Sequence, residues 1–335
     1  MNYKDIINHL ESNPSTWVVT GCAGFIGSNL IEALLKINQN VIGIDNFSTG
    51  NEWAVKDCEV LRVNLLDRDK LIQSLKGRYF DGVIHFAAKS LVGESVKSPD
   101  LYYRNNVIGT INLVNEMLEN GIKNLVFSST AAIFGNPLTD KIDEDHPKTP
   151  INPYGQSKLM VENMLRDICS AYDFNAICFR YFNAAGAYES GEIGEAHDPE
   201  THLIPNVLNS ALSGGNELKV YSDDYETHDG TCVRDYVHVT DLAQAHLLGL
   251  TYMKENKGFS AFNLGNGNGF SVLDVIKSCE RVLGNPIRYK MDLRREGDPA
   301  VLVADSLKAI HTLGWKPKFN DLDEIIKSAW HWHGS

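Results

Sequence analysis

The sequence predicts an α/β protein with an open, doubly wound parallel sheet and a smaller mixed α/β domain after it. Three observations lead to this fold class. Short apolar runs alternate with stretches of helical periodicity over the first half of the 335 residues, a glycine-rich turn follows the first run, and the alternation becomes irregular near residue 183. Strand–helix–strand repetition of this kind places helices on both faces of a parallel sheet.

Six short apolar runs are typical of buried parallel strands. They are Trp17–Thr20, Val41–Ile44, Val60–Val63, Val83–Ala87, Leu125–Ser129 and Ala176–Tyr181. The stretches with helical periodicity are Asn29–Ile37, Asp69–Leu75, Pro99–Glu119 and Pro153–Tyr172. Residues 1–16 precede the first strand, and we expect them to add a short helix that ends at Pro14.

The second half is less regular. A glycine- and acid-rich stretch, Ala184 to Glu200, leads into a region with shorter elements. We expect strands at Lys219–Tyr221 and Tyr236–Val239 and helices at Asp241–Met253 and Val272–Leu283. The sequence therefore predicts two domains, residues 1–183 and 184–335, with residues 236–265 as a segment that returns to the large sheet.

Composition limits the choice of partners. Acidic residues outnumber basic ones by 43 to 31, so the formal net charge is −12. Nucleic acid and anionic membranes both need a cationic surface, so we expect neither as a partner, and an anionic ligand would need a local basic cluster. Six scattered cysteines form no C-x-x-C pair, and the first residues include acids instead of an apolar signal segment. Both features indicate a cytoplasmic location.

The first predicted strand leads into the turn TGCAGFIG, which opens a helix. Gly21, Gly24 and Gly27 permit a tight turn, a close approach to a pyrophosphate at the helix N-terminus, and close packing of helix on strand. Asp45 ends the next strand, where its carboxylate can accept hydrogen bonds from both ribose hydroxyls and repel a 2′-phosphate. Residues 1–183 are therefore expected to be a Rossmann domain that binds NAD rather than NADP.

A second group of polar residues indicates chemistry at the same edge of the sheet. The fifth strand ends in the hydroxyls of residues 128–130, and ligands of such sheets bind at the carboxyl ends of strands. Downstream, Asn152 can cap a helix that begins at Pro153. Tyr154 and Lys158 lie one turn apart on that helix. A free phenol has a pKa of about 10, but a nearby ammonium and a positive nicotinamide ring favour the phenolate, so Tyr154 is a candidate general base.

These segments together resemble the extended short-chain dehydrogenase/reductases, through TGCAGFIG, the SST hydroxyls, YGQSK and RYFNAAGA. Four further motifs narrow the resemblance to the UDP-galactose (UDP-glucose) 4-epimerases, and the likeness runs over nearly the whole chain. They are HFAAKSLVGESV, YYRNNVIGT, DDYETHDGTCVRDYVHV and RREGDPA. The opening residues, through DNFSTG, are more similar to relatives that epimerise UDP-N-acetylhexosamines.

The resemblance implies interconversion of UDP-galactose and UDP-glucose through a 4-keto sugar, with NAD bound throughout turnover. Tyr154 would take the proton of the sugar 4-hydroxyl. Thr130, where most relatives have Ser, would bridge the 4-oxygen and the phenol. Lys158 would hold the nicotinamide ribose and lower the pKa of the tyrosine.

The resemblance also implies a set of NAD contacts. They come from Gly21, Gly24, Phe25, Ile26, Gly27, Asp45, Asn46, Phe86, Ala87, Asn105, Ser128, Tyr154, Lys158 and Tyr181. One family contact is shifted, because many relatives have HFAGLK where this chain has HFAAKS. Lys89 therefore lies one place early, and Ser90 stands at the aligned position.

Residues 184–335 are implied to bind the UDP-sugar, whose diphosphate Arg234 and Arg295 would clamp with planar guanidinium groups. The implied substrate residues are Thr130, Tyr154, Asn183, His202, Leu203, Lys219, Tyr221, Arg234, Tyr236, Arg295, Asp298 and Leu302. Many relatives have Asn at the position of His202. His331 and His333 lack a third ligand, so we expect no metal.

Sugar preference is implied to depend on the side chain at Leu302. A bulky Tyr there restricts some relatives to glucose and galactose, whereas small residues admit N-acetyl groups. Leucine is intermediate, so we expect UDP-glucose/UDP-galactose activity with some activity on UDP-N-acetylglucosamine and UDP-N-acetylgalactosamine. A dedicated UDP-N-acetylhexosamine 4-epimerase is the alternative.

Two other functions use the same fold. A 4,6-dehydratase needs an acid and a base beside the catalytic hydroxyl, where this chain has Ala131 and Ala132. A non-catalytic NAD-binding protein needs the glycines but no Tyr–Lys pair. The helices at Pro99–Glu119 and Pro153–Tyr172 carry apolar residues on more than one face, which predicts a homodimer with a four-helix interface.

Overall fold

The large sheet has seven parallel strands. The structure, a computed structural model, describes residues 3–212, 217–295 and 298–334. The strand order is β10-β6-β5-β4-β1-β2-β3. The bounds are β1 Thr16–Thr20, β2 Asn40–Asp45, β3 Glu59–Arg62, β4 Gly82–His85, β5 Asn124–Thr130, β6 Asn175–Tyr181 and β10 Phe259–Leu264. This order confirms the predicted fold class, and it places the topological switch point between β1 and β4.

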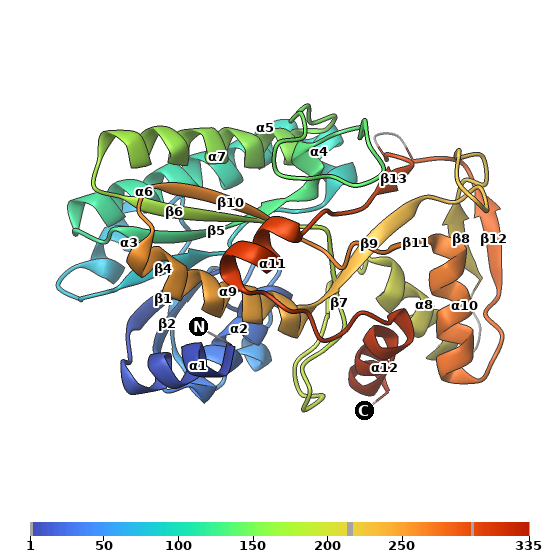
Figure 1. Cartoon of the computed structure of the whole chain (residues 1–335), viewed down its shortest axis with the longest axis horizontal. Coiled ribbons are helices and arrows are strands. Elements are labelled where there is room, and N and C mark those ends of the chain that lie inside the picture. Colours follow the sequence, from blue (N-terminus) through green and yellow to red (C-terminus); the bar gives the residue numbers. More distant parts are fainter. Residues whose placement is uncertain (1–2, 213–216, 296–297, 335) are drawn as a thin grey trace.

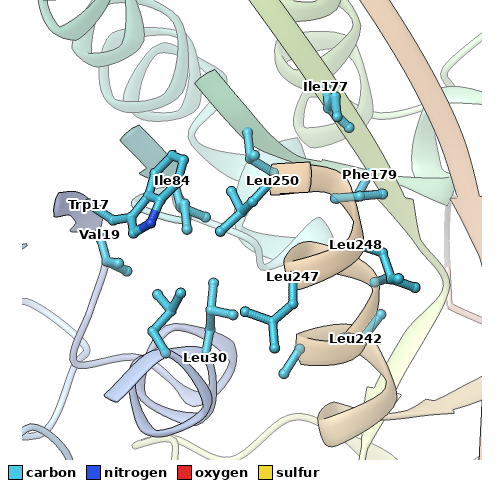
Figure 2. Packing of buried hydrophobic residues seen from close by; sticks show 14 of the residues in the cluster. Trp17, Val19, Leu30, Ile84, Ile177, Phe179, Leu242, Leu247, Leu248 and Leu250 are labelled. Atoms are coloured by element: carbon cyan, nitrogen blue, oxygen red, sulfur yellow. The ribbon is translucent and has the colours of Figure 1, made fainter. Parts of the chain in front are cut away.

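Helices cover both faces of this sheet (Figure 1). Trp17 and Val19 of β1 point to one face and Val18 to the other, as the strand period requires. The first face packs against three helices, α1 (Tyr3–Ser12), α2 (Phe25–Lys36) and α9 (Val239–Glu255). Figure 2 shows Leu30 of α2 on the side of Trp17 and Val19, and Leu248 of α9 on the side of Phe179. The second face packs against α3 (Arg68–Leu75), α6 (Gly109–Glu119) and α7 (Pro153–Ala171).

Two helices differ from the sequence expectation. The first begins at Phe25 instead of Asn29, because the small residues of its first turn carry no apolar periodicity. The helix expected at Pro99–Glu119 is interrupted: α5 (Pro99–Tyr102) leads into a π-helical turn at Tyr103–Ile108 before α6 begins. Such wide turns are frequent at functional sites.

A smaller part of the fold continues from the end of β6, at the carboxyl edge of the large sheet (Figure 1). One small sheet contains β7 (Asn183–Ala185), β9 (Val233–His238), β11 (Gly269–Ser271) and β13 (Val301–Leu302), and β8 (Leu218–Tyr221) pairs with β12 (Tyr289–Asp292). Three amphipathic helices share an apolar cluster there, α8 (Leu203–Leu212), α10 (Val272–Leu283) and α12 (Leu322–His333). The shorter helices are α4 (Val92–Lys97) and α11 (Leu307–Leu313).

None of the helices in the described ranges combines the length and the apolar character that crossing a membrane would require.

A buried ion pair joins α7 to the sheet. The guanidinium of Arg180 donates to the carboxylate of Glu162 at 3.0 and 2.7 Å, and both side chains are almost fully buried. Ser129 Oγ donates to the same carboxylate at 2.5 Å, and Arg180 also reaches the carbonyl oxygen of Glu144 at 3.2 Å. The pair therefore fixes α7 relative to β5 and β6.

We expect Glu162→Met to lower the free energy of unfolding by about 3–5 kcal/mol, because the change leaves the buried Arg180 charge without a partner. Denaturant unfolding followed by circular dichroism measures this loss. The matched control is Glu52→Gln, which breaks the exposed pair with Arg62 and is expected to cost about 1 kcal/mol or less. Equal losses in the two variants would contradict a special role for the buried pair.

Candidate active site

The glycine turn between β1 and α2 is built from close backbone contacts. Gly21 has a φ of +67°, and a Cβ at this position would lie 2.5 Å from the backbone nitrogen of Ala87. A Cβ on Gly27 would lie 2.3 Å from the carbonyl oxygen of Gly21. At Gly24 the only close atom is the same oxygen, at 3.4 Å. The fold itself therefore excludes side chains at two of the glycines, whereas the third leaves space beside the helix N-terminus.

This space suits an anionic group. Gly24 caps α2 without a side-chain hydrogen bond, and the first turn of a helix has N–H groups with no intrahelical acceptor. These groups and the helix dipole favour an anion such as a diphosphate. A cavity over the turn is lined by Gly24 and Phe25 on one side and by Ala196 and His197 on another. The residues present thus suit the diphosphate of NAD.

Asp45 lies at the end of β2, directly beside the turn. One carboxylate oxygen accepts the N–H of Ala23 at 3.0 Å and the other accepts the N–H of Phe47 at 2.8 Å. These bonds fix a buried carboxylate at the place expected for the adenosine ribose. Asn46 is used differently in this structure, since its side-chain oxygen accepts the N–H of Ser48.

The end of β4 and the π-helical turn form the next wall. Phe86 and Ala87 follow β4, and the N–H of Phe86 bonds to the carbonyl oxygen of Thr20. Asn105 is half-buried and donates to the side chain of Asn106 at 3.1 Å. Asn106, which the sequence analysis missed, is buried and bonds to both backbone groups of Lys89 and to Ser157 Oγ.

The hydrogen bonds of Asn106 fix the backbone of the shifted HFAAKS motif at Lys89. Lys89 has its backbone fixed by Asn106, and its ammonium lies 3.8 Å from the carboxylate of Glu94. Ser90, at the position aligned with the family lysine, is exposed.

Tyr154, Lys158 and Thr130 come together where β5 ends beside the start of α7. The side chain of Asn152 accepts the N–H of Gly155 at 2.9 Å, so the predicted cap is present and α7 begins at Pro153. Thr130 closes β5, and a hydrogen bond from its hydroxyl reaches the phenol of Tyr154. Lys158 Nζ donates to the carbonyl oxygen of Ser128 at 2.6 Å.

The protein surroundings disfavour the charged forms of both Tyr154 and Lys158. Burial raises the pKa of Tyr154, and the Thr130 hydrogen bond lowers it only in part. Burial also lowers the pKa of Lys158 to about 7, against the opposing effects of Cys178 and Glu162. The lower tyrosine pKa expected from the sequence depends partly on the positive nicotinamide ring. This chain does not supply that charge.

Tyr181 belongs to the same wall. Its hydroxyl bonds to His246 Nε2 of α9 at 2.6 Å, and burial raises its pKa while a hydrogen bond with Ser128 lowers it. His246 was not identified from the sequence, because it lies on a helix whose pattern indicates only burial.

Several of the predicted substrate residues lie on or beside β9 and β13. Arg234 donates to the carboxylate of Asp298 at 3.4 Å, and Leu302 lies opposite it in the strand register. Arg295 stacks on Tyr221, with its guanidinium carbon 3.8 Å from the ring centre. Burial raises the pKa of the Cys232 thiol, whereas the positive charges of Arg234 and Arg295 lower it.

Other predicted substrate residues are placed in three ways. Asn183 and the buried Tyr236 are register partners on β7 and β9. Lys219 is exposed and pairs with Asp292 at 3.0 Å. Leu203 begins α8 and packs against the third apolar cluster.

His202 makes contacts that the sequence did not predict. Its Nδ1 lies 2.6 Å from Glu195 Oε1 and 3.5 Å from Glu200 Oε1. Burial by itself would lower the pKa of His202, but the two carboxylates outweigh it and raise the pKa to about 10. The predicted substrate contact of His202 is therefore limited to the rest of the ring and the backbone.

The profile of the NAD dependent epimerase/dehydratase family matches residues 17–265. This chain belongs to that family. Within it, the UDP-glucose 4-epimerase of Halalkalibacterium halodurans is 48% identical over 94% of this chain and 95% of its own length.

Two solved family structures extend the comparison. The UDP-glucose 4-epimerase from Bifidobacterium longum in complex with NAD+ and UDP is 38% identical, with a TM-score of 0.92 over 96% of this chain and 98% of that one. The UDP-Glc/GlcNAc 4-epimerase from Campylobacter jejuni is 39% identical, with a TM-score of 0.83 over 96% and 99%.

If Gly24 faces the diphosphate of NAD, Gly24→Ala should leave the fold intact and weaken NAD binding. Filling a close-packed contact with a methyl group typically costs about 1–3 kcal/mol, which corresponds to a roughly tenfold or greater loss of affinity. Gly27→Ala should instead destabilise the protein itself, because its Cβ would meet the backbone of Gly21.

The readouts are NAD released per chain by acid and the thermal melting temperature. Gly93→Ala is the control, since a Cβ there meets nothing within 4 Å. Full NAD content in Gly24→Ala would show that the diphosphate binds elsewhere.

Proposed function

We propose that this chain is an NAD-dependent 4-epimerase that interconverts UDP-glucose and UDP-galactose. The observation that supports it best is the convergence of Tyr154, Thr130 and Lys158 at the carboxyl edge of the sheet that carries the glycine turn. Relatives of 43–48% identity over nearly the whole chain are UDP-glucose 4-epimerases. The alternatives of a dedicated N-acetylhexosamine enzyme and of a non-catalytic NAD-binding protein have no comparable support.

The reaction needs a base, a hydrogen-bond relay and a fixed pocket. NAD, when bound, would supply the hydride acceptor and donor that C4 of the sugar requires. Tyr154 takes the proton of the 4-hydroxyl and later gives it back, while Thr130 holds the 4-oxygen and the phenol together. Lys158 positions the nicotinamide ribose. Ala131 and Ala132 follow Thr130 and have no group that transfers a proton, so elimination of water is not supported.

The remaining residues bind the rest of the substrate. Arg234 and Arg295 are assigned to the local basic cluster that a diphosphate needs in an acidic protein. Tyr236, Tyr221 and Asp298 line the same region and are assigned to the uridine and its ribose.

The central test is a coupled assay for UDP-glucose formed from UDP-galactose. Tyr154→Phe should lower kcat by about 10²–10⁴-fold, because it removes the group that transfers the proton. Tyr172→Phe, on an exposed tyrosine at the end of the same helix, should leave the rate unchanged. Undiminished conversion by Tyr154→Phe would refute the assignment.

Activity on N-acetylated sugars is a second proposal. Leu302 packs with Ala131 and Phe134, the segment that follows Thr130, so its side chain lies close to the catalytic edge. The similar Campylobacter jejuni structure is named for both glucose and N-acetylglucosamine substrates.

We therefore expect measurable turnover of UDP-N-acetylglucosamine. Leu302→Tyr should lower it by roughly tenfold or more, since a bulky ring fills the volume that the N-acetyl group needs. The rate with UDP-galactose serves as the control and should change little. Loss of both activities together would show that Leu302 does not select the sugar.

A homodimer is also proposed. Ile108, Ile111 and Met160 are apolar side chains left exposed on the π-helical turn, α6 and α7. Two copies packed through these helices would cover them and form a two-fold, four-helix interface. Sedimentation that finds only monomer at micromolar concentration would contradict this.

We place the enzyme in the cytoplasm. Its six cysteines are all free, and three of them are buried (Cys22, Cys178 and Cys279), which suits a reducing compartment.

A further inference from the structure

A second cluster of ionisable side chains lies outside the catalytic edge, in the segment between β7 and α8. Its members are Glu195, His197, Glu200 and His202, and one ligand atom from each lies within 4.8 Å of all the others. From the sequence, this segment is expected to be an acid-rich connection with a substrate contact at His202. The fold turns it back on itself, so that both imidazoles face both carboxylates.

Three of the four nitrogen–oxygen distances in this cluster are close to those of a coordination shell, although the two Glu200 contacts use different oxygens. In a tetrahedral zinc site with bonds of about 2.0–2.1 Å, neighbouring ligand atoms lie about 3.3–3.4 Å apart. His197 Nδ1 lies 3.4 Å from Glu195 Oε1 and 3.6 Å from Glu200 Oε2, and His202 Nδ1 lies 3.5 Å from Glu200 Oε1. The fourth distance, from His202 Nδ1 to Glu195 Oε1, is 2.6 Å, which is a hydrogen-bond distance. A proton between these two atoms takes the place of a cation here.

One nitrogen of the cluster points to a missing ligand. His197 Nδ1 is buried and makes no hydrogen bond in the described part of the chain, although two carboxylate oxygens flank it. Glu195 is only 4% exposed, and its buried charge is paired here with His202 at 2.6 Å and His197 at 3.4 Å, the positions from which a bound ion would displace protons. The side chain of His202 is 44% exposed, which leaves an entrance for an ion.

Neighbouring groups hold the ligands in place. Glu200 Oε1 accepts the N–H groups of Thr201 and His202, both at 2.8 Å. The carbonyl oxygen of Glu195 accepts Trp332 Nε1 at 3.2 Å, and that of Ala196 accepts Asn51 Nδ2 at 3.0 Å. Such outer bonds orient metal ligands in known sites.

We propose that Glu195, His197, Glu200 and His202 bind one divalent transition-metal ion, with Zn²⁺ as the best match. Metal binding would displace the protons of both imidazoles, and the resulting shell of two neutral imidazoles and two carboxylates carries a charge of −2, which one such ion balances. A shell of two nitrogens and two oxygens suits Zn²⁺, whereas Mg²⁺ and Ca²⁺ need six or more oxygen ligands.

The proposed site is structural. Four protein ligands leave no open position for substrate, as in closed zinc sites. The ion would join the loop after β2, through Asn51, to α12, through Trp332, and to the start of α8. It would thereby fix the segment that covers the glycine turn.

The test uses the tag-free, full-length protein with its bound NAD, treated with a chelator, dialysed and titrated with Co²⁺. We expect about one Co²⁺ per chain, the intense visible bands of tetrahedral cobalt, and their loss when Zn²⁺ is added. Zn²⁺ should also raise the melting temperature of the treated protein by several degrees. No Co²⁺ bound above background would overturn the proposal and leave a protonated ion-pair cluster.

Variants locate the binding. His197→Ala and Glu200→Gln should each lower Co²⁺ affinity by at least about tenfold and abolish the tetrahedral bands. His228→Ala is the matched control, because His228 lies in the other His/Asp cluster, which is more exposed. Bands that persist in both cluster variants, or that disappear in the control, would place the ion elsewhere. Circular dichroism of the treated variants separates loss of binding from loss of fold.

Discussion

The close contact between the Gly21 carbonyl oxygen and Gly27 determines where the rest of the site can lie. No side-chain atom fits there, so α2 starts directly at the edge of the sheet and directs its N–H groups across that edge. The Asp45 carboxylate then contacts the same turn from the end of β2. Ala87, which follows β4, and Thr130, which ends β5, lie at the same edge of the sheet. An anion bound to the helix is thereby held in reach of groups from four parallel strands.

Burial shifts the pKa values of the two proposed catalytic groups in opposite directions. It raises the pKa of the Tyr154 phenol and lowers that of the Lys158 ammonium, so the protein alone disfavours the charged form of both. The same low-polarity surroundings strengthen the electrostatic interaction of these groups with any charge brought next to them. A positively charged ligand at this place would therefore act strongly on the tyrosine, which links proton transfer to occupancy of the nucleotide site.

The sequence predicted those features whose cause is local. Continuous apolar runs located six of the seven strands of the large sheet to within a few residues, because strands buried on both faces need them. The seventh strand, β10, was expected only as part of a segment that returns to the sheet. Tyr154, Lys158 and the glycines follow from short spacings. The roles of Asn106, Glu162 and His246 could not be predicted from such spacings, since each side chain acts through a partner distant in sequence. The Glu195–His202 cluster was missed for another reason: its residues are close in sequence, but only the folded turn makes their side chains converge.

The place of β10 has a consequence for biosynthesis. This strand comes late in the chain, yet it pairs with β6, all seven of whose residues are buried. Until residue 264 has left the ribosome, β6 is an unpaired sheet edge, and such edges are prone to associate with other chains. A nascent enzyme with its nucleotide-binding half already synthesised would thus need protection from aggregation during translation.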